Sequence, residues 1–171
     1  MATGLLKFFK TSWFVGFLTS SIGQKLIMSL TGLFLITFLA VHLVGNLQLM
    51  ADDGGQAFNK YAYFMTHNPL IKTVSYGLYA FILLHAIQGI VLWRRNKSAR
   101  GKEGYAVKVD RTAGDVSRVS SVYMGALGTV ILIFILIHMW QFWLQMKLDK
   151  VPMVAYDGKE VKDLYTLVAV A

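Results

Sequence analysis

Three long stretches of the chain contain no charged side chain, and they limit the possible folds more than any other feature. They cover residues 26–51, 73–93 and 119–146. A helix of about 20 apolar residues is long enough to cross the hydrocarbon core of a bilayer. The sequence therefore predicts an all-α integral membrane protein, a transmembrane helix bundle with three spanning helices at about 26–50, 70–93 and 120–146.

The basic residues are distributed unevenly between the connecting segments. Residues 94–118 hold eight Lys and Arg against three Asp and Glu, whereas the segment 52–72 is balanced. The first 25 residues carry lysines and no acid. Because segments inside the cell are enriched in Lys and Arg, we expect the N-terminus and the loop 94–118 on the inner side. This topology accounts for the net charge of +8, so no nucleic acid is expected as a partner.

The remaining segments fit around the three helices. Residues 1–20 mix aromatic side chains with lysines, which is typical of a segment lying on a membrane surface. The pair Asn68-Pro69 is expected to open the second helix. Residues 147–171 are expected on the outer side, first as a polar loop. The apolar run from Leu164 is expected to begin a fourth helix that is cut off.

Each spanning stretch contains a single histidine: His42, His85 and His138. An ionisable side chain within a membrane helix is costly and normally faces a partner in the bundle interior, and histidine is the commonest metal ligand. The chain has no cysteine, which excludes cysteine-ligated clusters and covalently attached haem. These residues predict haem b bound between the helices by its axial ligands.

Depth along the helices sorts the three histidines. His42 lies ten residues before Asp52, and His138 lies nine before Lys147. At 1.5 Å per residue, both are about 14–15 Å from the outer edge. His85 is at a similar depth from the opposite side, nine residues before Arg94. We expect His42 and His138 to hold one iron, and His85 to belong to a second site.

The neighbours of the three histidines repeat. Each has a phenylalanine four residues before it and an amide one turn after it, so these groups share its helix face: Phe38, Phe81 and Phe134, with Asn46, Gln88 and Gln141. Gly45 and Gly89 would leave room for a flat macrocycle. The alternative is that the glycines serve close helix packing and that each imidazole is simply hydrogen-bonded. His67 is interpreted as an interfacial residue rather than a ligand.

Three motifs in the first half of the chain carry a family resemblance. They are Ser-Ser-Ile-Gly-Gln-Lys at 20–25, Met-Ser-Leu-Thr-Gly-Leu-Phe at 28–34 and His-Leu-Val-Gly-Asn-Leu at 42–47. The chain resembles the dihaem cytochrome b membrane anchor of succinate dehydrogenase and fumarate reductase, in its single-polypeptide, menaquinone-linked bacterial form.

The resemblance implies five membrane helices and two b haems. It implies that His42 and His138 ligate the haem distal to the soluble subunits, and that His85 ligates the proximal haem. The fourth ligand of that family would lie on a fourth helix, which this chain does not contain. The partners would be an FAD-containing flavoprotein subunit, an iron–sulfur subunit and membrane lipids. The chain would pass electrons between the iron–sulfur subunit and menaquinone in the bacterial inner membrane, without touching succinate.

Other readings stay open at this point. Ser20, Ser21, Gln24 and Lys25 are candidates for binding a quinone at the inner surface, and an outer site near His67 is a further possibility. The basic loop 94–118 would face the soluble subunits or anionic lipid. The chain could instead be the cytochrome b of a quinone-linked hydrogenase or formate dehydrogenase. It could also be a haem-free transport or structural protein that uses its histidines as a proton path.

Overall fold

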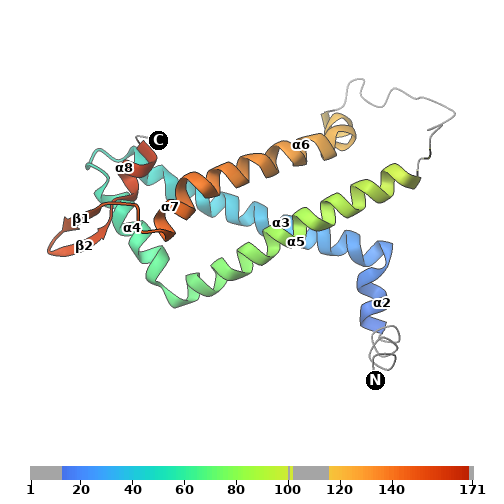
Figure 1. The fold of residues 1–171 in the computed structure, drawn as a ribbon, viewed down its shortest axis with the longest axis horizontal. Helices are drawn as coiled ribbons and strands as arrows, with labels where there is room; N and C mark the ends of the chain where they lie inside the picture. The colour runs from blue at the N-terminus through green and yellow to red at the C-terminus, as the bar shows by residue number, and fades with distance from the viewer. Residues whose placement is uncertain (1–12, 100, 102–115, 170–171) are drawn as a thin grey trace.

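The computed structural model describes residues 13–99, 101 and 116–169 of the chain, and these are mostly helical. Three long helices lie lengthwise in the molecule, and the short elements gather at their ends (Figure 1). In chain order the elements are α2 (Trp13–Thr19), α3 (Ser21–Asn46), the 3₁₀ helix η1 (Leu47–Met50), α4 (Gln56–His67), α5 (Pro69–Ala99), α6 (Val116–His138), the π-helix η2 (Met139–Leu144), α7 (Gln145–Lys147), β1 (Met153–Tyr156), β2 (Lys159–Lys162) and α8 (Leu164–Ala169).

The two ends of the long helices are built differently. We name the end with α4, the β1–β2 hairpin and α8 the hairpin end, and the opposite end the α2 end (Figure 1). Helix α3 packs along α5, and α5 in turn contacts α6. Helix α2 packs against the start of α3, while α4 packs against α5 and α8.

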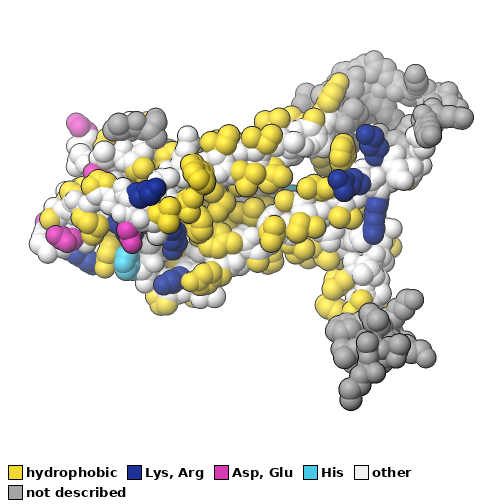
Figure 2. Space-filling view, in the orientation of Figure 1, with side chains coloured by type: hydrophobic (Ala, Val, Ile, Leu, Met, Phe, Trp, Pro, Cys, Tyr) yellow, Lys and Arg dark blue, Asp and Glu magenta, His cyan; other side chains and the backbone are white. Residues whose placement is uncertain are grey.

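The three apolar stretches form helices long and apolar enough to cross a membrane, as the sequence predicts. They span Ser21–Met50, Pro69–Ala99 and Tyr123–Lys147. In the most apolar 18-residue window of each, 6% or less is buried inside the protein. Figure 2 shows the consequence: hydrophobic side chains cover the middle of the molecule, and charged side chains gather towards its ends. Such surface would need lipid or another protein around it.

Side-chain caps set where two of these helices begin. Ser20 precedes α3, and its hydroxyl accepts a hydrogen bond of 3.0 Å from the backbone N–H of Gly23. Asn68 precedes α5, and its Oδ1 accepts from the N–H groups of Leu70 and Ile71 at 3.0 and 3.3 Å. Both are N-cap arrangements, which satisfy N–H groups that have no partner within the helix. Pro69 opens α5, as expected.

Helix α5 extends further than the sequence analysis expected. It continues to Ala99 rather than ending at Trp93, so Arg94, Arg95 and Lys97 lie on the helix and not in a loop. No glycine or proline interrupts the chain there before Gly101, which has a φ of +68°. Since Arg and Lys are good helix formers, their charge ends the apolar stretch without ending the helix. Residues 1–12 and 102–115, which include most of the predicted surface segment and basic loop, lie outside the described residues.

The segment after α7 is not the polar loop that was expected. It forms an antiparallel hairpin in which Met153 pairs with Lys162 and Tyr156 pairs with Lys159. Asp157 and Gly158 make its two-residue turn, with φ values of +53° and +76°. Asp-Gly with both φ angles positive is a favoured hairpin connection. The following apolar residues form the short helix α8, which packs on α4.

One buried asparagine joins the parts of the hairpin end. Asn59 of α4 is 1% exposed. Its Nδ2 donates to the Tyr156 hydroxyl at 3.2 Å and to Asp163 Oδ1 at 3.0 Å. Its Oδ1 accepts from the backbone N–H of Tyr165 at 2.8 Å. Asn59 therefore connects α4 to the hairpin, to the residue that follows it and to α8.

Replacing this asparagine should detach the hairpin end. In Asn59→Ala the three partners lose their hydrogen bonds in a buried place, which should reduce the local free energy of unfolding by about 2–3 kcal/mol. Amide hydrogen exchange over β1, β2 and α8 measures this loss. Gln56→Ala on the same helix is the control, because the Gln56 side chain has no hydrogen bond among the described residues. Equal protection of these amides in the two variants would contradict the role of Asn59 in holding the hairpin end together.

Acid should weaken the same region. The hydrogen bond from Lys162 lowers the pKa of Asp149. Partial burial tends to raise the pKa of Asp163, but hydrogen bonds from Thr166 and Asn59 outweigh it and the pKa is lowered. Groups whose pKa falls on folding stabilise the fold above the unfolded-state value of about 3.9, and this stabilisation is lost as the pH drops through the folded-state value.

We therefore expect amide protection of β2 and α8 to decline below about pH 4. The first turn of α5 should not follow, since the neutral side chain of Asn68 caps it. Hydrogen exchange between about pH 5 and pH 3, corrected for intrinsic rates, compares the two segments. A parallel decline in both would show that these carboxylates are not responsible.

Candidate cofactor site between the long helices

Two of the three predicted ligands face each other in the structure. His42, near the end of α3, and His138, the last residue of α6, have ring centroids 5.9 Å apart and ring planes at 90°. They are far apart in sequence and lie on different long helices. Their distances from the charged flanks predict one level for these two residues, and in the structure their rings lie close together.

Aromatic side chains flank both rings. Phe38 stacks on His42 with centroids 5.3 Å apart, and Phe134 stacks on His138 at 5.6 Å. Phe142 approaches His138 from the other side, at 5.0 Å. The phenylalanine four residues before each histidine therefore contacts the ring as expected. These contacts restrict the rotation of both imidazoles and place apolar rings beside them.

The ring nitrogen atoms of the pair have no protein partner among the described residues. Asn46, expected to share the histidine's surroundings, donates instead to the backbone carbonyl of His42 at 2.7 Å. A polar group in apolar surroundings normally has a hydrogen-bond partner or a ligand. Both rings are accessible, because His42 is exposed and His138 is half-buried within the described chain.

The separation of the rings fits a shared metal ion. An imidazole nitrogen binds a metal at about 2 Å, so a metal held from two sides separates the ring centroids by roughly 6 Å. The observed 5.9 Å agrees. The described residues contain no group of three or more metal-binding side chains. The two imidazoles could each supply one nitrogen ligand to a metal held between them.

His85 lies in different surroundings. Its Nδ1 is 3.0 Å from the hydroxyl of Thr31 on α3. The adjacent Gly32 leaves space for its ring, because a Cβ there would be 3.3 Å from His85 Cε1. No ring contact joins His85 to another histidine among the described residues. Thr31 is 4% exposed, and the sequence analysis did not identify it as part of the site.

The two glycines expected to make room for a macrocycle contact protein instead. A Cβ on Gly45 would lie 2.7 Å from the Tyr61 ring, so this glycine allows α3 and α4 to pack closely. A Cβ on Gly89 would be 3.5 Å from the methyl group of Met28. The contacts of Gly45 support the helix-packing alternative, whereas the distance at Gly89 is an ordinary van der Waals contact and leaves both alternatives open.

The predicted quinone residues divide into two groups. The Ser20 hydroxyl caps α3 and also donates to the Phe17 carbonyl at 2.6 Å. Gln24 is buried; it donates to the Thr19 carbonyl at 3.1 Å and accepts from Arg95 at 2.6 Å. These two side chains hold α2, α3 and α5 together at the α2 end. Ser21 and Lys25 are exposed and have no side-chain hydrogen bond within the described residues.

A π-helical turn directly follows His138. The N–H groups of such a turn bond five residues back, so the fifth residue stands above the first. Trp143 is five residues after His138, and its Nε1 donates to the Tyr79 hydroxyl of α5 at 2.7 Å. On either side of this wide turn, His138 contacts His42 of α3 and Trp143 bonds to Tyr79 of α5.

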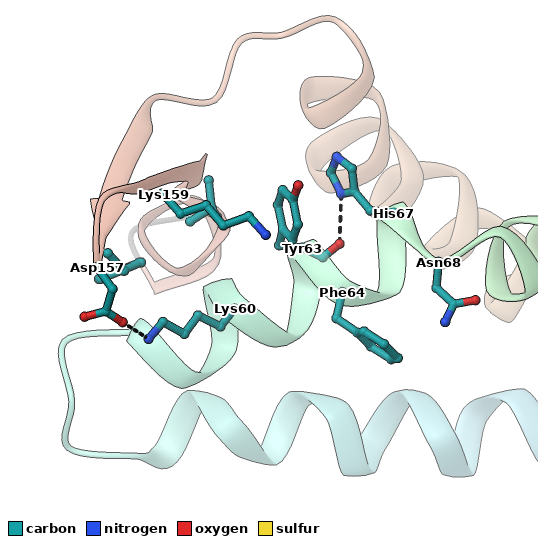
Figure 3. Close-up of a pocket in the computed structure, with 9 residues that line it drawn as sticks. Lys60, Tyr63, Phe64, His67, Asn68, Asp157 and Lys159 are labelled. Atoms are coloured by element: carbon teal, nitrogen blue, oxygen red, sulfur yellow. Dashed lines mark hydrogen bonds and ion pairs between the residues drawn. The ribbon is translucent and has the colours of Figure 1, made fainter.

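The fourth histidine lies elsewhere, in an open pocket at the hairpin end (Figure 3). His67 stacks on Tyr63 with centroids 3.8 Å apart, and its Nδ1 donates to the Tyr63 carbonyl at 2.8 Å. Lys159 lies over the same tyrosine ring at 4.1 Å, while Lys60 pairs with Asp157 at 2.6 Å. The polar groups of this pocket mostly contact one another, and His67 is not part of the histidine pair.

Removing the Gln24 hydrogen bonds tests its structural role. Gln24→Leu leaves Arg95 and the Thr19 carbonyl without this partner, which should reduce the free energy of unfolding by about 1–2 kcal/mol. Thermal unfolding in detergent and hydrogen exchange over α2 provide the measurement. Ser21→Ala is the matched control, because Ser21 is exposed. An unchanged unfolding temperature in Gln24→Leu would contradict this structural role and would again make Gln24 a candidate for binding a ligand.

Comparisons with protein-family models, with curated proteins and with solved structures find no match for the chain. The family resemblance therefore rests on the motifs quoted from the sequence. What the structure adds is the geometry of the histidines that the resemblance implies as ligands.

Proposed function

We propose that the chain is the haem b-containing membrane anchor of a succinate dehydrogenase or fumarate reductase. It passes electrons between an iron–sulfur subunit and menaquinone in a bacterial inner membrane. The observation that carries the proposal is the pairing of His42 and His138, whose ring separation of 5.9 Å suits two axial ligands of one iron. The sequence motifs at 20–25, 28–34 and 42–47 supply the family.

The charge at the two ends of the molecule supports an orientation in the membrane. Lys25, Arg94, Arg95 and Lys97 lie at the α2 end, without an acidic residue among the described residues there. The hairpin end carries both signs of charge, including the pairs of Lys60 with Asp157 and Lys162 with Asp149. By the positive-inside rule, the α2 end faces the cytoplasm, where the flavoprotein and iron–sulfur subunits bind.

Bound haem supplies one-electron transfer at a potential set by its ligands and surroundings. His42 and His138 would hold its iron, and the stacked phenylalanines Phe38 and Phe134 would orient these imidazoles. The apolar rings beside the imidazoles would change the relative stability of the two iron charge states. His85 contributes a ligand to a second haem nearer the cytoplasmic side.

The candidate residues for binding a quinone are those whose polar side chains have no hydrogen bond within the described residues. Ser21 and Lys25 are exposed at the cytoplasmic end of α3, beside the predicted position of the inner haem. Their hydroxyl and ammonium groups can donate to a quinone carbonyl oxygen. We assign the quinone contact to this pair and withdraw Ser20 and Gln24, whose polar atoms have partners in the protein.

Histidine variants with measured haem test the proposal. We expect the purified full chain to show a reduced b-type band. His42→Ala and His138→Ala should each remove the same haem species, identified by its band position and midpoint potential. His67→Ala is the matched control: it removes a histidine at the hairpin end and should leave the haem unchanged, because His67 contacts Tyr63 and not the pair.

Each result discriminates between functions. Absence of a b-type band from wild-type protein would reject the haem proposal and favour a haem-free transport or structural role. Loss of different haem species from the His42 and His138 variants would reject the shared iron. Co-purification of the haem protein with a nickel or molybdenum enzyme, rather than an FAD protein, would assign it to a hydrogenase or formate dehydrogenase.

A further inference from the structure

Thr31 is a buried polar residue on the face of α3 that contacts α5. It is 4% exposed, and its hydroxyl oxygen has three neighbours. The carbonyl oxygens of Ile27 and Met28 lie 2.8 and 3.1 Å away, and His85 Nδ1 lies 3.0 Å away. A hydroxyl has one proton to donate and can also accept. The position of that proton decides which nitrogen of His85 carries a hydrogen.

The other threonines of the long helices show where such a proton goes. Thr37 donates to the carbonyl four residues earlier at 3.0 Å, and Thr129 does the same at 2.8 Å. This is the usual bond of a threonine within a helix. With its proton directed to Ile27, the Thr31 oxygen can only accept from His85. Nδ1 of His85 therefore carries the hydrogen, and Nε2 is left with a free lone pair.

We propose that Thr31 is a positioning residue that fixes His85 in the tautomer with a free Nε2, ready to bind a metal. The inference deepens the proposed function, on which it rests, by naming the residue that prepares the second ligand site. Gly32 lies beside the same ring: a Cβ there would be 3.3 Å from His85 Cε1, so a side chain would push the ring by a few tenths of an ångström. A hydrogen bond donated by the remote nitrogen also makes the imidazole a stronger donor to a metal.

The histidine pair lacks this device. Neither His42 nor His138 has a hydrogen bond to its ring among the described residues. The two sites therefore differ in how the protein holds the ligand: packing against phenylalanine in the pair, and hydrogen bonding to Thr31 at His85. A variant of Thr31 should affect the His85 site alone.

The test compares Thr31→Val, Thr31→Ser and Thr37→Val in the full chain. Valine matches the shape of threonine but cannot accept a hydrogen bond, whereas serine keeps the hydroxyl. Thr37→Val is the matched control, since Thr37 is on the same helix and bonds only to a backbone carbonyl. The first readout is the ¹⁵N spectrum of labelled histidine in protein from haem-depleted cells, which reports the tautomer of His85. The second, in the assembled complex that supplies the other ligand of that haem, is the amount and midpoint potential of the haem that His85→Ala removes.

We expect wild type, Thr31→Ser and Thr37→Val to show His85 with hydrogen on Nδ1, and Thr31→Val to show a mixture of tautomers. In haem-loaded protein, Thr31→Val should weaken haem retention at the His85 site by about 10-fold or more and raise its potential, without changing the haem held by His42. An unchanged tautomer in Thr31→Val would overturn the inference, whether or not haem is present. Absence of haem from wild type, with the tautomer as expected, would reject the proposed function and leave the role of Thr31 intact.

Discussion

An imidazole within an apolar helix must find partners for its two nitrogen atoms, and the arrangement of the long helices follows from where those partners lie. His85 meets the requirement through Thr31, which fixes the register of α3 against α5. The rings of His42 and His138 lie 5.9 Å apart without a hydrogen bond to either ring among the described residues, and their contact places α3 and α6 at one level. Because an unpaired polar group in apolar surroundings costs free energy, the bond between Thr31 and His85 favours one register of α3 and α5 over its neighbours.

Interactions at the two ends hold the helices in that register. At the α2 end, buried Gln24 connects the end of α2 to Arg95 on α5. At the hairpin end, Asn59 connects α4 to the strands and to α8. In each case one amide side chain both donates and accepts hydrogen bonds, and its partners lie on different elements. The apolar middle of the molecule contains few such bonds, so the ends determine much of the mutual position of the helices.

The sequence predicted the elements whose signals are local. Charge-free length identified the three long helices, and the Asn-Pro pair identified the start of α5. The predicted end of α5 was wrong. Charged residues were taken to end the helix, but Arg and Lys are good helix formers, and α5 continues to Ala99, close to Gly101. The hairpin was also missed: Asp157-Gly158 is a turn signal, but the flanking strands are only four residues long and alternate weakly. Their pairing depends on docking against α4, which no local pattern reports.

For the site, the sequence predicted candidate ligand residues and, through their depth, that His42 and His138 stand level, and the structure places these two rings 5.9 Å apart. Counting along a helix is enough for that, because each residue advances it by a fixed rise. Which polar side chains are already hydrogen-bonded to a neighbouring helix could be known only from the three-dimensional packing. Gln24 is hydrogen-bonded to Arg95, Gly45 packs against Tyr61, and Thr31 is hydrogen-bonded to His85. These contacts join residues from different helices, and which faces of two helices meet depends on packing along their whole length rather than on any single residue.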